Sequence, residues 1–146
     1  MFAVGRAQTV LHLLAQLRAA GRIPELPTYL NSPMAVDATE LFLRTTGEHR
    51  LEPADVAAMA SGVEFVHTVE DSKRLTARRG PMIVLSASGM LTGGRVLHHL
   101  FQVAPDHRST IVLAGFQAAG TRGEWSAEPE GQAGIRRAGT PDAPAH

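Results

Sequence analysis

The chain has 146 residues, 44% of them hydrophobic, and its 14 basic side chains are balanced by 14 acidic ones. This length predicts one globular domain, and the balanced charge excludes a protein that is basic overall, so any site for a polyanion must be a local patch. The absence of cysteine excludes disulfides and thiolate zinc sites. No apolar run approaches the roughly 18 residues of a membrane span, and we expect a soluble, cytoplasmic protein with no membrane partner.

The hydrophobic pattern predicts alternating helices and strands. Apolar residues recur at helical spacing at Val10, Leu13, Leu14 and Leu17, and the glycine and proline that follow predict a first helix over residues 4–20. The next elements predicted in order are a strand at Thr28–Leu30, a helix at Val36–Arg44, a short helix within 49–62, a strand within 63–69 and a short helix or turn within 72–80.

Two further strands decide the fold class. Residues 81–87 and 109–115 are nearly continuous apolar, β-branched runs, typical of parallel strands buried on both faces. Residues 93–104 between them predict a crossover helix, which makes a right-handed βαβ unit. The sequence therefore predicts an α/β fold with an open, mostly parallel sheet, helices on both faces and a Rossmann-like topology.

The loop that joins residues 81–87 to the following helix is the first candidate site. Its glycines let backbone N–H groups approach a ligand, and the helix that begins near Gly93 directs its N-terminal dipole to the same place. Arg95 adds a charge, and Ser88 or Thr92 adds a hydroxyl. These features predict an anion-binding loop, although the same glycines also fit a simpler role in the tight packing of strand against helix.

No other pattern predicts chemistry. The loop is neither a P-loop nor a G-x-G-x-x-G fingerprint, and its serine does not lie in G-x-S-x-G. The seven histidines form no spacing typical of a metal site, so each is predicted to lie at the surface or in packing, with His99 the one most able to face the cleft or sheet. We predict no catalytic residue and no metal ligand in this chain.

Five segments together resemble a known family. These are "FAVGRAQTVLHLL", "PTYLNSPMAVDATELF", "FVHTVEDSKRL", "PMIVLSASGMLTGGRVLHHL" and "STIVLAGFQAAGTRG". In this order they resemble the β-CASP region of the RNA-processing nucleases with a metallo-β-lactamase fold, and above all the bacterial and archaeal hydrolases related to the cleavage and polyadenylation specificity factor. The resemblance implies a partial β-CASP domain over residues 1–123. Residues 124–146, rich in Pro, Gly and Ala, are predicted to form a flexible tail outside the family.

The resemblance also implies a function for the loops. Family members are zinc-dependent hydrolases that cut RNA, but the zinc ligands lie in a lactamase-like domain whose motifs are missing from this sequence. Asn31 stands where the family usually has an aspartate before Ser-Pro. The residues expected to contact RNA phosphates are Ser88, Gly89, Gly93, Gly94, Arg95, Gln117, Gly120 and Thr121.

Three hypotheses of function remain. In the first, the chain is a fragment of a ribonuclease that clamps single-stranded RNA weakly through its backbone, is inactive alone and contains no cofactor. In the second, it is a standalone, non-catalytic module that binds RNA or a protein such as a separate lactamase-like chain. In the third, it is an unrelated mononucleotide-binding domain. Under the first hypothesis a missing strand before the first helix leaves a sheet edge bare, which predicts possible self-association.

Overall fold

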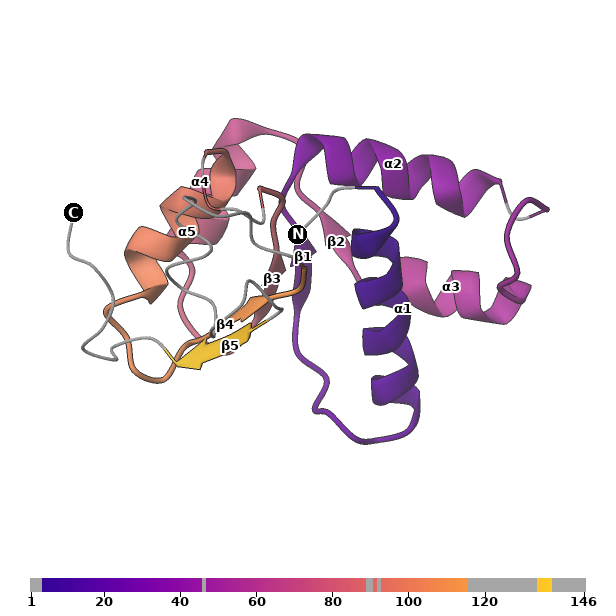
Figure 1. The fold of residues 1–146 in the computed structure, drawn as a ribbon, viewed down its shortest axis with the longest axis horizontal. Helices are drawn as coiled ribbons and strands as arrows, with labels where there is room; N and C mark the ends of the chain where they lie inside the picture. The colour runs from indigo at the N-terminus through magenta and orange to yellow at the C-terminus, as the bar shows by residue number, and fades with distance from the viewer. Residues whose placement is uncertain (1–3, 46, 89–90, 92, 116–133, 138–146) are drawn as a thin grey trace. The chain divides into compact units, whose positions relative to one another are not determined.

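The computed structural model describes residues 4–45, 47–88, 91 and 93–115, and the backbone of 134–137 (Figure 1). The chain divides into two compact units, which meet in sequence between Ser86 and Ala87. We call residues 3–86 the sheet unit and residues 87–146 the loop unit, and describe each by itself. None of the helices in the described ranges is long and apolar enough to cross a membrane.

The sheet unit contains a parallel sheet in the order β2-β1-β3, with helices around it. Its elements are α1 (Arg6–Ala19), β1 (Thr28–Leu30), α2 (Pro33–Arg44), α3 (Pro53–Ser61), β2 (Glu64–Phe65), α4 (Val69–Ala77) and β3 (Ile83–Leu85). The central strand β1 aligns Tyr29 with Glu64 on one side and with Val84 on the other. The predicted α/β class with a mostly parallel sheet is confirmed.

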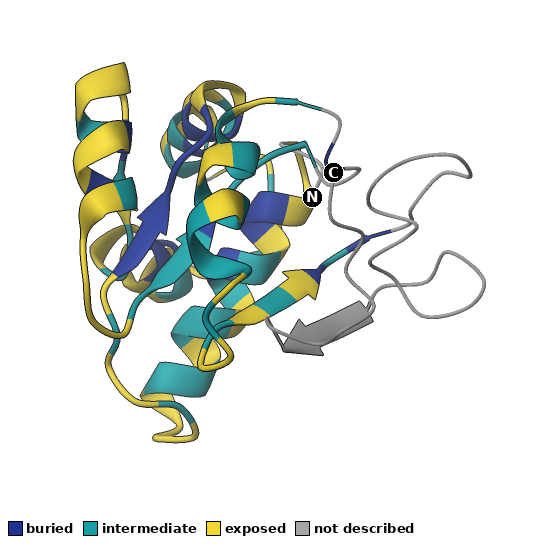
Figure 2. Ribbon diagram, turned by 90° about the vertical axis from the view of Figure 1, so that its left-hand side faces the viewer, coloured by how far each residue is buried: buried dark blue, intermediate teal, exposed yellow. Residues whose placement is uncertain are grey.

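Helices cover both faces of this sheet. On each face, β1 presents a side chain that either is hydrogen-bonded to a helix or packs against one. On one face, the Arg18 guanidinium of α1 donates to the Thr28 hydroxyl and also to the carbonyl oxygens of Leu26 and Gly62, at 2.8 and 2.7 Å. On the other face, Tyr29 packs against Leu75 of α4. All three residues of β1 are buried, as expected for a parallel strand between two helical layers (Figure 2).

The first helix buries a different face from the predicted one. The spacing of apolar residues predicts that Val10, Leu13, Leu14 and Leu17 share a core face, but Leu13 is 50% exposed and the other three are only half-buried. The buried residues of α1 are Ala7, Gln8 and Leu11. The burial of the polar Gln8 is tolerated because its side-chain amide donates a hydrogen bond to the Thr39 hydroxyl of α2 at 2.7 Å.

A polar network closes the carboxyl end of β1. Asn31 is fully buried, and its side-chain amide donates to Ser72 Oγ of α4 at 2.9 Å. Its backbone N–H donates to the Leu85 carbonyl at 2.8 Å, while Ser86 Oγ donates to the Asn31 carbonyl at 2.9 Å. The network therefore joins β1 to α4 and to the end of β3.

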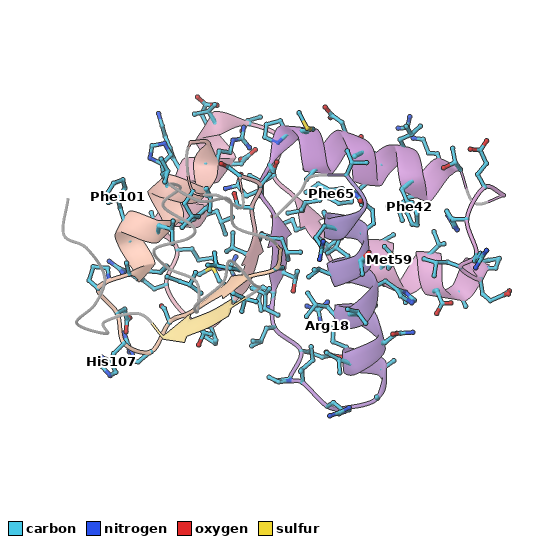
Figure 3. The ribbon with its side chains drawn as sticks, viewed as in Figure 1. Arg18, Phe42, Met59, Phe65, Phe101 and His107 are labelled. Carbon is cyan, nitrogen blue, oxygen red and sulfur yellow. The ribbon has the colours of Figure 1, made fainter. Side chains whose placement is uncertain are left out.

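The helices of the sheet unit begin where the sequence supplies start signals. Pro33 and Pro53 occupy the first turns of α2 and α3, where the missing N–H of proline costs nothing. The Thr68 hydroxyl caps α4 by accepting from the Asp71 N–H at 3.0 Å. Figure 3 shows Met59 of α3 directed toward α1, where it is 2% exposed.

The loop unit contains α5 (Arg95–Val103), β4 (Thr110–Leu113) and β5 (Gly134–Arg137). β4 pairs antiparallel with β5. It alternates between exposed and more buried residues, with Val112 60% exposed, which is typical of an antiparallel strand with one open face. The predicted parallel pairing of β4 with the strand before α5 would join the two units and stays a prediction. β5 lies within the stretch predicted as a flexible tail.

Candidate functional site

The loop before α5 is anchored by one apolar side chain. Leu91 is 6% exposed and belongs to a buried cluster with Leu113 of β4, against which Val96, Leu97 and Leu100 of α5 pack. The Leu91 N–H donates to the Ser88 carbonyl at 3.0 Å, which closes the loop into a turn. Leu91 thus holds the loop against the first turn of the helix.

The backbone of this loop adopts left-handed conformations at two residues that are not glycine. Ser88 has φ 69° and Leu91 has φ 56°, a region that non-glycine residues enter rarely and only where their surroundings determine it. Such outliers gather at sites where a loop must present its backbone to a ligand. The loop is therefore held in one particular shape by the turn and by the burial of Leu91.

The glycines of the loop are explained by conformation rather than by lack of space. A Cβ added to Gly93 would meet no atom of the described residues within 4 Å, and one on Gly94 would lie 3.8 Å from Ser88 Cβ, an ordinary contact. Gly94 needs to be glycine because its φ is 80°. Among the described residues, this weakens the interpretation that the two glycines merely permit tight packing.

The N-terminus of α5 follows directly on this loop. Gly94 is the N-cap residue, so no side chain caps the helix, and the first turn contains no acidic residue. The first N–H groups of a helix have no partner within it, and together with the helix dipole they favour an anion. Arg95, half-buried in the first turn, adds a full positive charge at the same end.

Two histidines follow in the same helix, and one of them is partly buried. His98 is exposed, whereas His99 is half-buried. Burial lowers the pKa of His99 below its ordinary value, and the neighbouring His98 lowers it further. His99 is therefore neutral at pH 7 and adds no charge to α5.

Half of the predicted phosphate-contacting residues can be located. Ser88, Gly93, Gly94 and Arg95 lie together around the turn that leads into α5. The other predicted residues, Gly89, Gln117, Gly120 and Thr121, lie outside the described residues. That the two loops form one site stays a prediction.

The described residues do not fit a metal centre. Within them, no group of three or more histidine, aspartate or glutamate side chains could hold an ion. The zinc that the family resemblance implies would therefore need ligands from outside the described residues.

One hollow of the sheet unit was missed in the sequence analysis, which assigned residues 72–80 only to a short helix or turn. It lies beside β2 and is lined by Tyr29, Glu64, Phe65, Val66, Asp71, Arg74, Leu75 and Arg78. The signal that could have found it is the spacing of Arg74 and Arg78, which places two guanidinium groups four residues apart along α4 and its C-cap.

Comparison with known proteins agrees with the resemblance described above. Residues 7–125 match the family described as the Beta-Casp domain. The chain is 38% identical over 135 residues to Ribonuclease TTHA0252 of Thermus thermophilus and 31% identical over 128 residues to Transcription termination factor FttA of Methanosarcina mazei. It is 27% identical over 133 residues to an RNase J-like protein of Methanocaldococcus jannaschii.

These alignments cover 84% of this chain in each case, but only 29%, 20% and 28% of the three relatives. The similarity therefore concerns one part of proteins that are several times longer. Since the family match extends over residues 7–125, most of the present sequence, the chain belongs to the Beta-Casp domain family.

Proposed function

We propose that this chain supplies contacts to the sugar-phosphate backbone of RNA in a zinc-dependent ribonuclease of the metallo-β-lactamase superfamily, and that it lacks the metal centre that performs the cleavage. The observation that carries the proposal is the uncapped N-terminus of α5, with Arg95 in its first turn and glycine backbone before it. Two similar proteins with ribonuclease in their names support the choice of RNA. The absence of cysteine fits a cytoplasmic location.

Such a site positions RNA without reading its sequence. Phosphate contacts from backbone N–H groups and arginine fix the register of a strand but do not distinguish bases. The half-site around Ser88, Gly94 and Arg95 should therefore bind single-stranded RNA weakly and with little sequence preference. Its affinity should fall as salt rises, because each neutralised phosphate releases counterions.

The chain alone should not cleave RNA. Hydrolysis of a phosphodiester in such enzymes depends on a metal-activated water, and the described residues offer no ligand set for the ion. Purified protein supplied with zinc or manganese should leave both RNA and a phosphodiester analogue intact. Metal-dependent cleavage that exceeds a mock purification would overturn this part of the proposal.

The test of binding is the variant Arg95→Ala. We expect it to weaken the binding of several single-stranded RNAs equally, by about 1–2 kcal/mol as for the loss of a charge-assisted hydrogen bond, and to flatten the salt dependence. Arg44→Ala, at the exposed end of α2, is the matched control and should leave RNA binding unchanged. A folded Arg95→Ala protein that binds like the parent at every salt concentration would remove Arg95 from the site.

A further inference from the structure

The hollow beside β2 has an apolar floor and a polar wall. It encloses about 590 Å³ within the sheet unit. Its floor is formed by Tyr29, Val66 and Leu75, each between 4% and 6% exposed, which belong to the buried cluster backed by Met82 and Val84. The floor is therefore part of the rigid core, whereas the wall consists of side chains from α4 and β2.

One guanidinium group of the wall is fixed in position. Arg78, at the C-cap of α4, donates from Nη1 to the Tyr29 hydroxyl, and its guanidinium carbon lies 5.4 Å from the centre of the Tyr29 ring. It forms no ion pair with any described residue. Arg78 thus presents a full charge, already ordered, at the rim of the hollow.

A second guanidinium group lies one turn earlier in the same wall. Arg74 Nη1 donates to Asp71 Oδ1 at 3.0 Å, and the same carboxylate accepts from the Thr68 hydroxyl at 2.6 Å. Asp71 is therefore engaged and its charge is offset. Lys73 and Arg79 are exposed on either side, so positive charge prevails around this end of α4.

The remaining polar group of the lining is an acceptor. Glu64 is exposed on β2 and forms no ion pair with any residue of the described ranges. A carboxylate there would repel a simple anion that filled the hollow, but it can accept hydrogen bonds from hydroxyl or amino groups. The lining is thus complementary to a ligand that has an anionic end, hydrogen-bond donors and an apolar face.

We infer that the hollow binds a nucleoside phosphate, either free or as one unit of an RNA strand. Arg78, with Arg74 beside it, contacts the phosphate, since arginine suits phosphate geometry. Glu64 accepts from a ribose hydroxyl or a base amino group, and the base rests over Val66 and Leu75. This site lies within the sheet unit and shares no residue with the loop before α5, so it is independent of the function proposed above.

The only tyrosine of the chain offers a direct readout, because Tyr29 lies in the floor. Protein labelled with 3-fluorotyrosine should give one ¹⁹F resonance. We expect uridine monophosphate to shift this resonance saturably, with an apparent affinity at least tenfold higher than that of uridine or of inorganic phosphate alone. The absence of a shift, or an equal shift with sodium chloride at matched ionic strength, would overturn the inference.

Variants locate the contact and separate the two sources of ligand. Arg74→Gln keeps the bond between Arg78 and Tyr29 and should weaken uridine monophosphate binding several-fold, and Arg78→Gln should weaken it tenfold or more. Unweakened binding in both would overturn the inference, while Arg44→Gln is the matched control. An RNA oligonucleotide that shifts the resonance at lower concentration than the monophosphate identifies a strand as the ligand, and the reverse order identifies a free nucleotide.

The ¹⁹F resonance of Tyr29 also tests whether the hollow is independent of the loop before α5. In the Arg95→Ala protein the response to uridine monophosphate should be unchanged, whatever happens to total RNA binding. If Arg95→Ala has no effect on RNA binding but the ¹⁹F shift persists, only the proposed function fails. If the shift is lost in Arg95→Ala protein that remains folded, the inference of an independent site fails.

Discussion

The two units of this molecule cover their strands in different ways. In the sheet unit, β1 is buried along its whole length, and its side chains contact α1 on one face and α4 on the other. In the loop unit, β4 alternates between exposed and buried residues, and no residue of α5 is fully buried. Phe101 of α5 is 70% exposed, as Figure 3 shows at the outer side of that helix.

This difference in burial implies that the two units differ in local stability. Core elements with dense apolar burial open only with the whole domain, whereas segments with few buried contacts open at lower free energy. The loop unit has a small buried cluster around Leu91 and Leu113, yet it contains the backbone outliers and the uncapped helix end. We conclude that the sheet unit supplies rigidity and that the loop unit presents a less buried helix and the loop before it.

The largest expected effect of a single change lies at the centre of the sheet. Leu30 is completely buried, so Leu30→Ala should lower the free energy of unfolding of the sheet unit by about 2–5 kcal/mol, through lost apolar contacts and the cavity left behind. Urea denaturation measures it. Leu41→Ala, at a residue 63% exposed, is the control and should change stability by less than about 0.5 kcal/mol. Equal effects of the two substitutions would contradict the comparison.

A smaller effect, confined to the other unit, is expected at the loop anchor. Leu91→Ala should lower the free energy of unfolding of the loop unit by about 2 kcal/mol, the low end for a buried leucine, because the cluster around Leu91 is small. Amide exchange in α5 should accelerate while exchange in β1 stays as slow as before. Val112→Ala, at a residue 60% exposed in the same unit, should leave both unchanged. Faster exchange in β1 would show that the two units do not open separately.

The smallest effect concerns pH and an exposed turn after α5. Hydrogen bonds from the Arg108 side chain and then from its backbone N–H lower the pKa of Asp106 well below its usual range. The folded pKa lies below the unfolded one, so this pair contributes stability above the ordinary pKa and loses it as pH falls through the folded value. Because the folded and the unfolded pKa of Asp106 both lie below pH 5, this pair itself should contribute no change in the free energy of unfolding between pH 5 and 8.

The titration itself is measurable by NMR at the Asp106 carboxyl carbon. In the parent protein its midpoint should lie below that of a free aspartate, and Arg108→Ala should raise it toward about 3.9, because the side-chain bonds are lost while the backbone N–H of residue 108 remains. A midpoint that does not move in Arg108→Ala would show that the bond between the two side chains is absent in solution.

The central strand of the sheet could be predicted with its exact bounds, because a strand that is buried on both faces has a distinctive apolar sequence. The strand at Thr28–Leu30 matches β1 because its three residues are buried and its ends are marked by Pro27 and Asn31. The pairing of β4 with β5 could not be predicted, since an apolar β-branched run indicates a strand but not all of its neighbours. Pairing with β5 depends on residues 134–137, whose sequence has no strand periodicity.

The face of α1 and the hollow beside β2 could not be predicted for a related reason. Gln8 and Arg18 look like solvent-facing residues in the pattern, but each finds partners distant in the sequence, namely Thr39 for the first and Gly62 for the second. In the candidate loop, the glycines and Arg95 were visible in the sequence. The left-handed conformation of Ser88 and the anchoring role of Leu91 were not, because both depend on the packing of α5 and β4.

The network at the end of β1 bears on the chemical ageing of the protein. Asn31 is followed by Ser32, a sequence in which the serine backbone nitrogen readily attacks the side-chain amide carbon and releases ammonia. Water then opens the resulting cyclic imide to aspartate or isoaspartate. Here the amide of Asn31 is bonded to Ser72 and fully buried, and Ser32 is held as the N-cap of α2. Deamidation must therefore wait until this end of the strand opens. The fraction of aspartate at residue 31 in a stored sample would record how often that opening has occurred.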